Sequence, residues 1–264
     1  MEIGLTSLPS LELEAGQVDV WLTCLCNVCR DQEAETLQLL SEAERSKWRR
    51  FVAEDARLQY LVSRALVRTT LSRYARVPEL AWQFQTNRYG RPSISQPQSY
   101  GDIQFNLSNT SGLVVCVVAK DCEIGVDVEN AARPVDIDAL APAVFSPDEL
   151  ADVRSLQSED KRYRFFSYWT LKEAYIKARA KGLSIPLDAF WFDLRGPSPV
   201  LRVTDRCLDE PTRWRFYQYA PTADHRLAIA VAAPRVARFS VRLHWITPTS
   251  PNAVPTRRCS RLAP

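Results

Sequence analysis

The sequence of 264 residues contains no apolar run of about 18 residues or more, so we expect no membrane-spanning helix. Residues 1–10 lack the basic head and apolar core of a secretory signal. An excess of one charge is also absent, because the formal net charge is only +3. This charge is too small to indicate nucleic acid as an obligate partner, but it leaves room for a local basic patch that binds a small phosphorylated ligand.

Seven cysteines without an export signal indicate a reducing compartment, and we expect a cytoplasmic protein. Cys24, Cys26 and Cys29 resemble part of a zinc site, but no fourth ligand or second cysteine pair stands at a suitable spacing. They lie in or just after the apolar residues 18–28, where cysteine behaves as a small hydrophobic side chain. We therefore predict no zinc site in this segment.

A weak internal repeat runs through the chain at an offset of roughly 110 residues. Its matches pair residues 18–20 with 126–128, 40–44 with 145–149, 77–84 with 185–192, and 112–119 with 225–233. The second match carries a serine at a predicted helix start each time. Each half is therefore predicted to run as strand, short helix, long helix, strand region and closing strand.

This order predicts an α+β protein of two similar subdomains related by a pseudo-twofold axis, each a small sheet packed with helices. The long helices are expected within residues 45–76 and 161–181, and the second should end at Gly182 as its C-cap. The predicted units are residues 1–121, 122–235 and 236–264, the last with an extra strand at 240–246 followed by a flexible tail.

Two acidic motifs give the strongest functional indication. The motif GVDVE is typical of a strand, so Asp127 and Glu129 leave one face about 6 to 7 Å apart. The motif WTLKEAYIK is typical of a helix, so Glu173 and Lys177 also share a face. Three carboxylates and one ammonium group at one point would hold a divalent cation and a phosphate ester, which favours phosphoryl-type transfer. A solvated strand edge and a surface ion pair are the simpler alternatives.

The first half has no counterpart of Glu129 and Glu173. Trp21 and Leu22 stand near the position of the second strand acid, and the matching helix is rich in arginine. Sites in chains of two similar halves often lie in the crevice between them. We therefore expect the active site in that crevice, with acids on one wall and bases on the other.

Three segments of the first half carry candidate binding residues. The turn NRYGRP contains Arg88 and Arg91 around a glycine and suits an anion, although most basic turns are simply solvated. Ser108 and Asn109 end a strand, where they either bind a ligand or cap a turn. The first long helix presents a basic face that we expect to be solvated, formed by Arg57, Arg64 and Arg68.

Taken together, these segments resemble the 4′-phosphopantetheinyl transferases, specifically the larger, pseudo-dimeric type named after the surfactin-synthetase activator. The resemblance covers roughly residues 45–187 with order and spacing kept. The segments that carry it are residues 90–92 (GRP), 105–108 (FNLS), 125–129 (GVDVE), 145–146 (FS), 169–177 (WTLKEAYIK) and 181–183 (KGL). The two acidic motifs at this separation are the specific part.

The resemblance implies coenzyme A as donor, an acyl or peptidyl carrier protein as acceptor, and 3′,5′-ADP as product, in a monomeric enzyme. It implies that Asp127, Glu129 and Glu173 hold Mg²⁺ on the pyrophosphate. Glu173 would take the proton of the carrier serine, and Lys177 would neutralise or protonate the phosphate. These roles are positioning and charge neutralisation, which phosphoryl chemistry requires.

The resemblance also implies a set of donor-binding residues in the first half. Basic side chains for the 3′-phosphate and neighbouring phosphates are Lys47, Arg50 and Arg57. The turn around the adenine and ribose, and the other expected substrate contacts, are Arg88, Gly90, Arg91, Pro92, Ser108 and Asn109, with Asp127 and Lys177 from the second half.

Asn109 departs from the family pattern, which has a histidine there that contacts the donor's phosphate. An asparagine donates a hydrogen bond but carries no charge, so we expect weaker donor binding or a pH dependence without that titration. Two alternatives stay open. One is a catalytically impaired homologue that only binds carrier proteins, and the other is a metal-dependent phosphohydrolase or nuclease.

Overall fold

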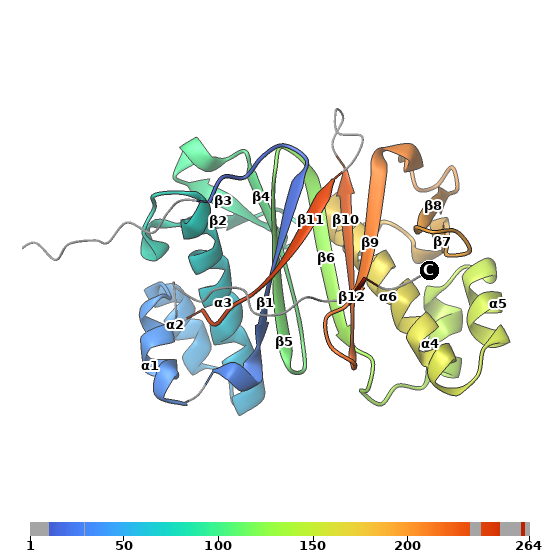
Figure 1. Ribbon diagram of the computed structural model, residues 1–264, viewed down its shortest axis with the longest axis horizontal. Helices are drawn as coiled ribbons and strands as arrows, with labels where there is room; N and C mark the ends of the chain where they lie inside the picture. Colours follow the sequence, from blue (N-terminus) through green and yellow to red (C-terminus); the bar gives the residue numbers. More distant parts are fainter. Residues whose placement is uncertain (1–10, 29, 233–238, 249–259, 262–264) are drawn as a thin grey trace, which may run out of the picture.

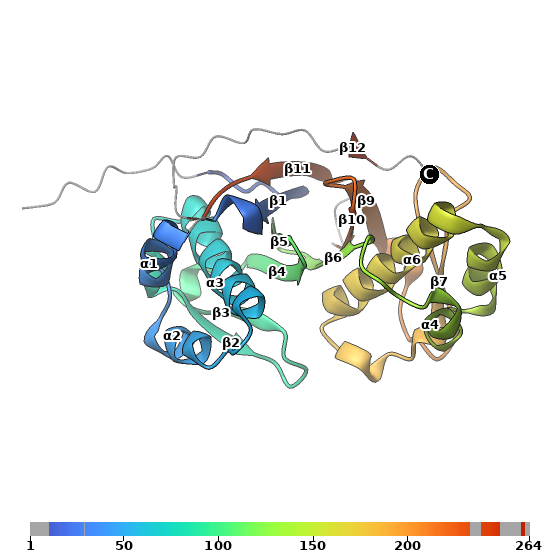
Figure 2. The ribbon, with the colours of Figure 1, turned by 90° about the horizontal axis from the view of Figure 1, so that it is seen from below.

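Two four-stranded sheets stand at the centre of the molecule, and each carries a group of helices on its outer side (Figures 1 and 2). The structure is a computed structural model that describes residues 11–28, 30–232, 239–248 and 260–261. Helices α1 to α3 cover one sheet and α4 to α6 the other (Figure 2). The predicted α+β class with two similar subdomains is confirmed. Within the described residues, no helix is long and apolar enough to cross a membrane.

The first half contains one sheet, three helices and a separate hairpin. Its elements are β1 (Gln17–Cys24), α1 (Arg30–Gln38), α2 (Glu42–Arg49), α3 (Glu54–Tyr74), β2 (Gln83–Thr86), β3 (Pro92–Gln96), β4 (Ile103–Thr110) and β5 (Leu113–Lys120). The sheet order is β11-β1-β5-β4, while β2 and β3 pair only with each other.

The second half repeats this plan. Its elements are β6 (Glu123–Asn130), α4 (Ile137–Val144), α5 (Pro147–Ser155), α6 (Ser158–Arg179), β7 (Phe190–Asp193), β8 (Val200–Val203), β9 (Trp214–Ala220) and β10 (His225–Ala232). The order β6-β10-β9 corresponds to β1-β5-β4 of the first half, with all these pairs antiparallel. Short 3₁₀ turns lie at Leu25–Asn27, Glu79–Ala81, Gln98–Tyr100, Gly182–Ser184, Leu187–Ala189 and Pro211–Arg213.

The C-terminal part of the chain adds a strand to each sheet. Strand β11 (Ser240–Trp245) lies where the sequence predicts an extra strand, and it pairs parallel with β1. Strand β12 (Ser260–Arg261) pairs antiparallel with β9. The rest of the tail that the sequence predicts, residues 249–259 and 262–264, lies outside the described residues.

One continuous core lies between the two sheets. Val20 of β1, Val126 of β6 and Ile229 of β10 are fully buried in it. Because side chains alternate along a strand, Trp21 of β1 points to the other face and packs with Leu66 of α3. Each sheet therefore buries both faces, one against the other sheet and one against its own helices.

The predicted helix starts are confirmed in both halves. Ser41 accepts a hydrogen bond from the Glu44 backbone, and the Glu44 side chain returns one to the Ser41 backbone. Ser146 and Glu149 form the same reciprocal cap at the start of α5. The predicted end of α6 is wrong, because Ala180, with φ 53°, is the left-handed C-cap and not Gly182.

Two further expectations are corrected by packing. Arg68 is 3% exposed, not solvated, because it pairs with Glu44 at 2.9 Å and donates to the carbonyl oxygens of Glu79 and Trp82. Cys24 and Cys26 are joined in a disulfide at the end of β1, and Cys26 is exposed. This pair therefore does not act as two small buried side chains.

Candidate active site

Strand β6 and helix α6 lie in direct contact because Gly125 has no side chain. A Cβ atom at this position would overlap the Ala174 carbonyl oxygen and the Ala178 backbone nitrogen of α6. The helix can therefore approach the strand more closely than any other residue would allow. This approach brings the strand acids that follow Gly125 beside the helix residues Glu173 and Lys177.

Asp127 forms the centre of the acidic cluster. Its Oδ1 atom accepts a hydrogen bond from the Ser108 hydroxyl at 2.9 Å. The same oxygen forms an ion pair with Lys177 Nζ at 2.6 Å. Lys177 Nζ also donates to Ser108 Oγ at 3.0 Å. Among the described residues, the other oxygen, Asp127 Oδ2, is buried and has no hydrogen-bond partner. One carboxylate oxygen is thus fixed, and the other is left for a ligand.

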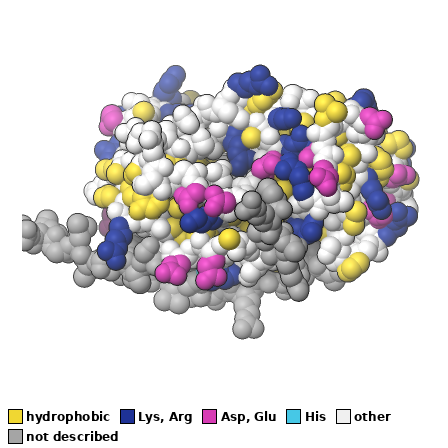
Figure 3. Space-filling view, turned by 90° about the horizontal axis from the view of Figure 1, so that it is seen from above, with side chains coloured by type: hydrophobic (Ala, Val, Ile, Leu, Met, Phe, Trp, Pro, Cys, Tyr) yellow, Lys and Arg dark blue, Asp and Glu magenta, His cyan; other side chains and the backbone are white. Residues whose placement is uncertain are grey.

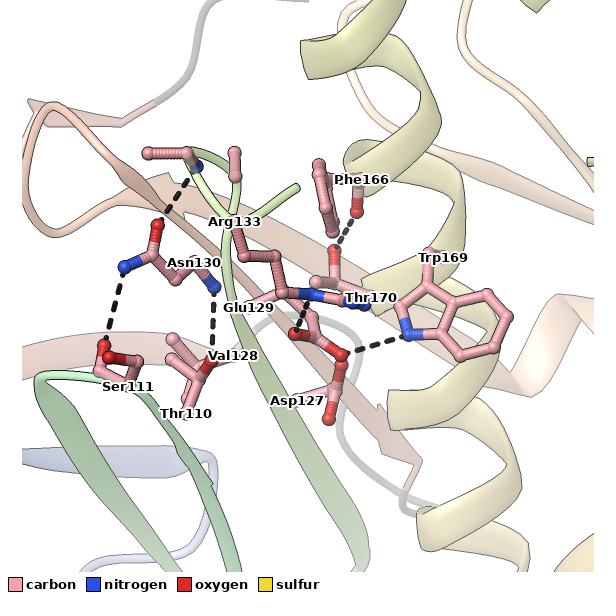
Figure 4. A network of polar contacts seen from close by, with 12 residues as sticks. Thr110, Ser111, Asp127, Val128, Glu129, Asn130, Arg133, Phe166, Trp169 and Thr170 are labelled. Atoms are coloured by element: carbon pink, nitrogen blue, oxygen red, sulfur yellow. Dashed lines mark hydrogen bonds and ion pairs between the residues drawn. The ribbon is translucent and has the colours of Figure 1, made fainter. Parts of the chain in front are cut away.

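Glu129 lies beside Asp127 and is held from two sides (Figure 4). Its Oε1 atom accepts a hydrogen bond from Trp169 Nε1 at 3.1 Å, and Oε2 lies 3.3 Å from Arg133 Nε. Burial raises the pKa of the Glu129 carboxyl, and the neighbouring charge of Asp127 raises it further. Both effects disfavour the charged form of Glu129, and a cation at this point would offset them.

Glu173 is half-buried, and within the described part of the chain its carboxylate makes no hydrogen bond or ion pair. Burial raises the pKa of this carboxyl, and the negative charges of Asp127 and Glu129 add to the increase, while Lys177 opposes it. The carboxylates of the two motifs therefore lie close enough to repel one another. This electrostatic arrangement fits a divalent cation.

The donor set also suits magnesium, which prefers carboxylate oxygens and keeps several waters. The buried, unpartnered oxygen of Asp127 would be satisfied by such an ion. The ligands are not preassembled, however: among the described residues, no three His, Cys, Asp or Glu side chains are gathered as a set that could hold a metal. Instead, Asp127 forms an ion pair with Lys177, and Glu129 forms an ion pair with Arg133 and a hydrogen bond with Trp169.

A cavity of about 280 Å³ lies beside the cluster, between the two halves. The first half contributes Tyr89, Gly90, Arg91, Pro92, Asn106 and Leu107 to its lining. The second half contributes Glu173, Ile176, Lys177, Ala180 and Gly182. In the view from above, Lys and Arg side chains lie next to Asp and Glu side chains near the middle of the molecule (Figure 3).

The turn between β2 and β3 binds the end of α6. Asn87 Nδ2 donates to the Ala180 carbonyl oxygen at 2.8 Å. The guanidinium of Arg91 donates to the carbonyl oxygen of Ala178 at 3.0 Å and also to that of Lys177. Carbonyl oxygens at the end of a helix lack the usual i+4 partner. The Lys177 oxygen already accepts from the Ala180 N–H at 3.2 Å, and the turn adds donors to this end of the helix. The contact fixes α6 near Lys177 relative to the first half.

The expected phosphate-binding side chains lie away from this cavity lining. Lys47 is exposed over the ring of Tyr60 at 5.4 Å, and Arg57 lies over Trp48 at 5.4 Å. Arg50 is the exposed C-cap of α2. Arg88 is exposed over the Tyr89 ring at 4.7 Å, and Asn109 is exposed with Nδ2 3.4 Å from Ser63 Oγ.

One residue of the helix motif has a structural position that the sequence interpretation missed. Lys172 is 1% exposed, pairs with Glu149 at 2.8 Å, and donates to the carbonyl oxygens of Leu187 and Phe190. The glutamate is the one that caps α5. Lys172 thus ties α5 and the β7 region to α6, away from the cavity. The indication available in the sequence was that Lys172 lies among the apolar residues of the motif WTLKEAYIK.

Comparison with known proteins adds independent information. A family model described as the 4′-phosphopantetheinyl transferase superfamily matches residues 123–232. A second model, described as the N-terminal part of a 4′-phosphopantetheinyl transferase, matches residues 27–121. The two models follow each other in the order of the two structural halves.

Whole-length relatives agree. The chain is 30% identical over 228 residues to the 4′-phosphopantetheinyl transferase HetI of Nostoc sp., covering 85% of this chain and 91% of that protein. It is 28% identical over 206 residues to the 4′-phosphopantetheinyl transferase Sfp of Bacillus subtilis, covering 78% and 88%. The fold and the matches to known proteins together define a transferase built from two similar subdomains. The chain belongs to the 4′-phosphopantetheinyl transferase superfamily.

Proposed function

We propose that the protein transfers the 4′-phosphopantetheine arm of coenzyme A to a serine of an acyl or peptidyl carrier protein, releases 3′,5′-ADP and depends on Mg²⁺. The observation that carries this proposal is the meeting of Asp127, Glu173 and Lys177 beside the cavity between the two halves. Family membership supplies the reaction, and these side chains supply the chemistry that it needs.

Asp127, Glu129 and Glu173 are the residues that would hold the ion. Within the part of the chain that the structure describes, Asp127 Oδ2 and the Glu173 carboxylate have no hydrogen-bond partner, which supports this assignment. A bound Mg²⁺ would neutralise charge on the pyrophosphate oxygens. It would also relieve the mutual repulsion that raises the pKa of Glu129 and Glu173.

Glu173 is the proposed general base. Its carboxylate has no protein partner in the described residues, and burial makes it a stronger base than an ordinary glutamate. The serine oxygen would bond to the β-phosphorus while the bond from that phosphorus to the oxygen of 3′,5′-ADP breaks. The serine proton would pass to Glu173, and the Lys177 ammonium would neutralise charge on the phosphate.

Donor binding would use both sides of the cavity. Gly90, Arg91 and Pro92 belong to its lining, which supports a contact with the adenine and ribose. The exposed cations Lys47, Arg50 and Arg88 and the half-buried Arg57 are available for phosphate groups. Since both walls come from one chain, a monomer with its active site in the crevice, acting in the cytoplasm, is the form that this proposal implies.

Mass spectrometry tests the proposal directly. The protein is incubated with coenzyme A, MgCl₂ and an apo carrier protein, and the intact mass of the carrier is measured. We expect a gain of one phosphopantetheine group, absent when the carrier serine is replaced by alanine. An unmodified carrier that still binds would instead favour the binding-only homologue, for which the neutral Asn109 is the motivating observation. Cleavage of a nucleic acid or phosphate ester would favour the hydrolase.

A further inference from the structure

Strands β4 and β6 lie side by side, although they belong to different sheets. Three β4 side chains replace the main-chain pairing between them. Asn106 Oδ1, Ser108 Oγ and Thr110 Oγ1 accept hydrogen bonds from the backbone N–H groups of Val126 at 2.9 Å, Val128 at 3.2 Å and Asn130 at 3.1 Å. Figure 4 shows the bond between Thr110 and Asn130. We call these three side chains the β4 ladder.

The β4 ladder joins the two halves of the chain. Its members stand at alternate positions and therefore on one face of β4. They satisfy the N–H groups along the edge of β6, which would otherwise be buried without partners. The ladder consequently holds the edge of β6 against β4, while the register of β6 within its own sheet comes from its pairing with β10.

Ser108 differs from the other two members because its hydroxyl makes two additional contacts. It lies 2.9 Å from Asp127 Oδ1 and 3.0 Å from Lys177 Nζ. A hydroxyl has one hydrogen to donate and two acceptor positions. The Val128 N–H and the Lys177 ammonium can only donate, so they fill both acceptor positions, and the hydroxyl hydrogen goes to Asp127. No hydrogen-bonding capacity remains for a phosphate of the donor.

These contacts select one oxygen of Asp127. Oδ1 receives the Ser108 hydroxyl and the Lys177 ammonium, whereas Oδ2 stays buried and unpartnered. We propose that Ser108 is a positioning residue, which holds Asp127 and Lys177 across the junction so that Asp127 Oδ2 faces a divalent cation. The inference rests on the proposed function, and it replaces the substrate contact that the resemblance implies for Ser108.

The variant Ser108→Ala tests this role, with Thr110→Val as the matched control. Thr110 belongs to the same ladder but touches neither Asp127 nor Lys177. Binding of Mn²⁺ to the full chain is measured by calorimetry with and without coenzyme A. We expect Ser108→Ala to weaken Mn²⁺ binding about 10- to 100-fold, the usual effect of removing a group that orients a metal ligand. Thr110→Val should keep the wild-type affinity.

Steady-state kinetics provides a second readout. Loss of positioning should lower kcat and leave the KM for coenzyme A nearly unchanged, and Ser108→Thr, which keeps a hydroxyl, should restore part of the loss. A raised KM with normal kcat and normal Mn²⁺ affinity would reinstate the substrate contact and overturn the proposal. So would an equal loss of Mn²⁺ affinity in both variants, or no Mn²⁺ binding by the wild type in either condition.

Folding and the proposed function can be separated from this outcome. If Ser108→Ala fails to fold, as judged by circular dichroism, Ser108→Cys takes its place because it keeps the volume with a weaker donor, and the same expectations apply. If the wild type modifies no carrier but Ser108→Ala still weakens Mn²⁺ binding, the proposed function fails while the positioning role stands. If the wild type modifies the carrier but Ser108→Ala binds Mn²⁺ as tightly as the wild type, the proposed function stands and the positioning role fails.

Discussion

The contact between β6 and α6 leads to a quantitative prediction for Gly125→Ala. The new Cβ would overlap the Ala174 carbonyl oxygen and the Ala178 nitrogen, and it would lie 3.0 Å from Ala178 Cα. All three are backbone atoms, so no side chain can rotate away. Because the new Cβ would lie 2.1 Å from the Ala174 oxygen and such non-bonded atoms need about 3.2 Å or more, α6 has to move outward by roughly 1 Å. Overpacking of this kind costs about 1–3 kcal/mol of the free energy of unfolding.

The same displacement should affect activity more than stability. α6 carries Glu173 and Lys177, and a 1 Å misplacement of reacting groups can lower a rate about 100-fold. We therefore expect Gly125→Ala to remain folded, to unfold at lower urea concentration, and to lose about 100-fold in kcat for carrier modification. Urea unfolding followed by fluorescence and the mass assay measure the two effects on one preparation.

The chain offers a matched control for this substitution. Gly101 is exposed, has φ −66°, and an added Cβ would approach only the Gln98 carbonyl oxygen, at 3.4 Å. Gly101→Ala should therefore change the free energy of unfolding by no more than about 0.5 kcal/mol and leave kcat unchanged. Wild-type stability and turnover in Gly125→Ala would refute the claim that close packing of α6 on β6 sets the site.

Three other predictions concern buried or reactive charges. Lys172→Met leaves the fully buried Glu149 without its partner and should cost about 3 kcal/mol or more in urea unfolding, whereas Lys120→Met, at an exposed pair, should cost less than about 1 kcal/mol. Burial raises the pKa of Asp19, but polar contacts outweigh burial and hold the pKa below 3.8. Asp19 therefore stabilises the fold above about pH 3.8 and loses this contribution as the pH falls further. The loss of unfolding free energy caused by Asp19→Asn, measured by urea unfolding, should shrink below that pH. A loss that does not change with pH would contradict this prediction. Glu173→Gln should lower kcat about 10²- to 10⁴-fold with an unchanged circular dichroism spectrum, and near-normal turnover would exclude Glu173 as the base.

The sequence predicted the architecture because each half carries the same local patterns. The serine caps at Ser41 and Ser146 mark equivalent helix starts, and both form as expected. The strand and helix periods also placed the acids correctly on β6 and α6, since period two and an i, i+4 spacing are properties of single elements. These parts of the site needed no knowledge of how the halves meet.

Contacts between the halves could not be predicted in this way. Arg91 suggested an anion site, yet its guanidinium lies on carbonyl oxygens at the end of α6, a segment 86 and 87 residues away in the chain. Ser108 was expected at a strand end as a ligand contact or turn cap, but Ser108 and its neighbour Asn106 accept hydrogen bonds from the edge of β6. Both outcomes depend on the relative placement of two subdomains, which no local pattern encodes. The sequence showed only that polar residues alternate along the strand that became β4, without showing what they contact.

Comparison of the two halves explains why the chain has one acidic site and not two. The internal repeat matches Asp127 of β6 with Asp19 of β1, and Asp19 is also buried, at 1% exposure. Its two oxygens accept from Tyr74 at 2.6 Å, Gln17 at 2.8 Å and Arg242 of β11 at 2.9 Å. A cation there would have to displace the guanidinium that already neutralises the charge.

The second half differs at each of these points. A glycine replaces Gln17 at the matching position, so α6 can lie directly on the strand. No strand equivalent to β11 supplies an arginine to Asp127, and Oδ2 keeps no protein partner among the described residues. Both aspartates are paired with a cation of the protein, but in the described residues Asp19 has partners on both oxygens, whereas Asp127 has partners on Oδ1 alone. The difference supports the proposed site on β6 and a stabilising role for Asp19 of β1, which the predicted effects of Ser108→Ala and Asp19→Asn test.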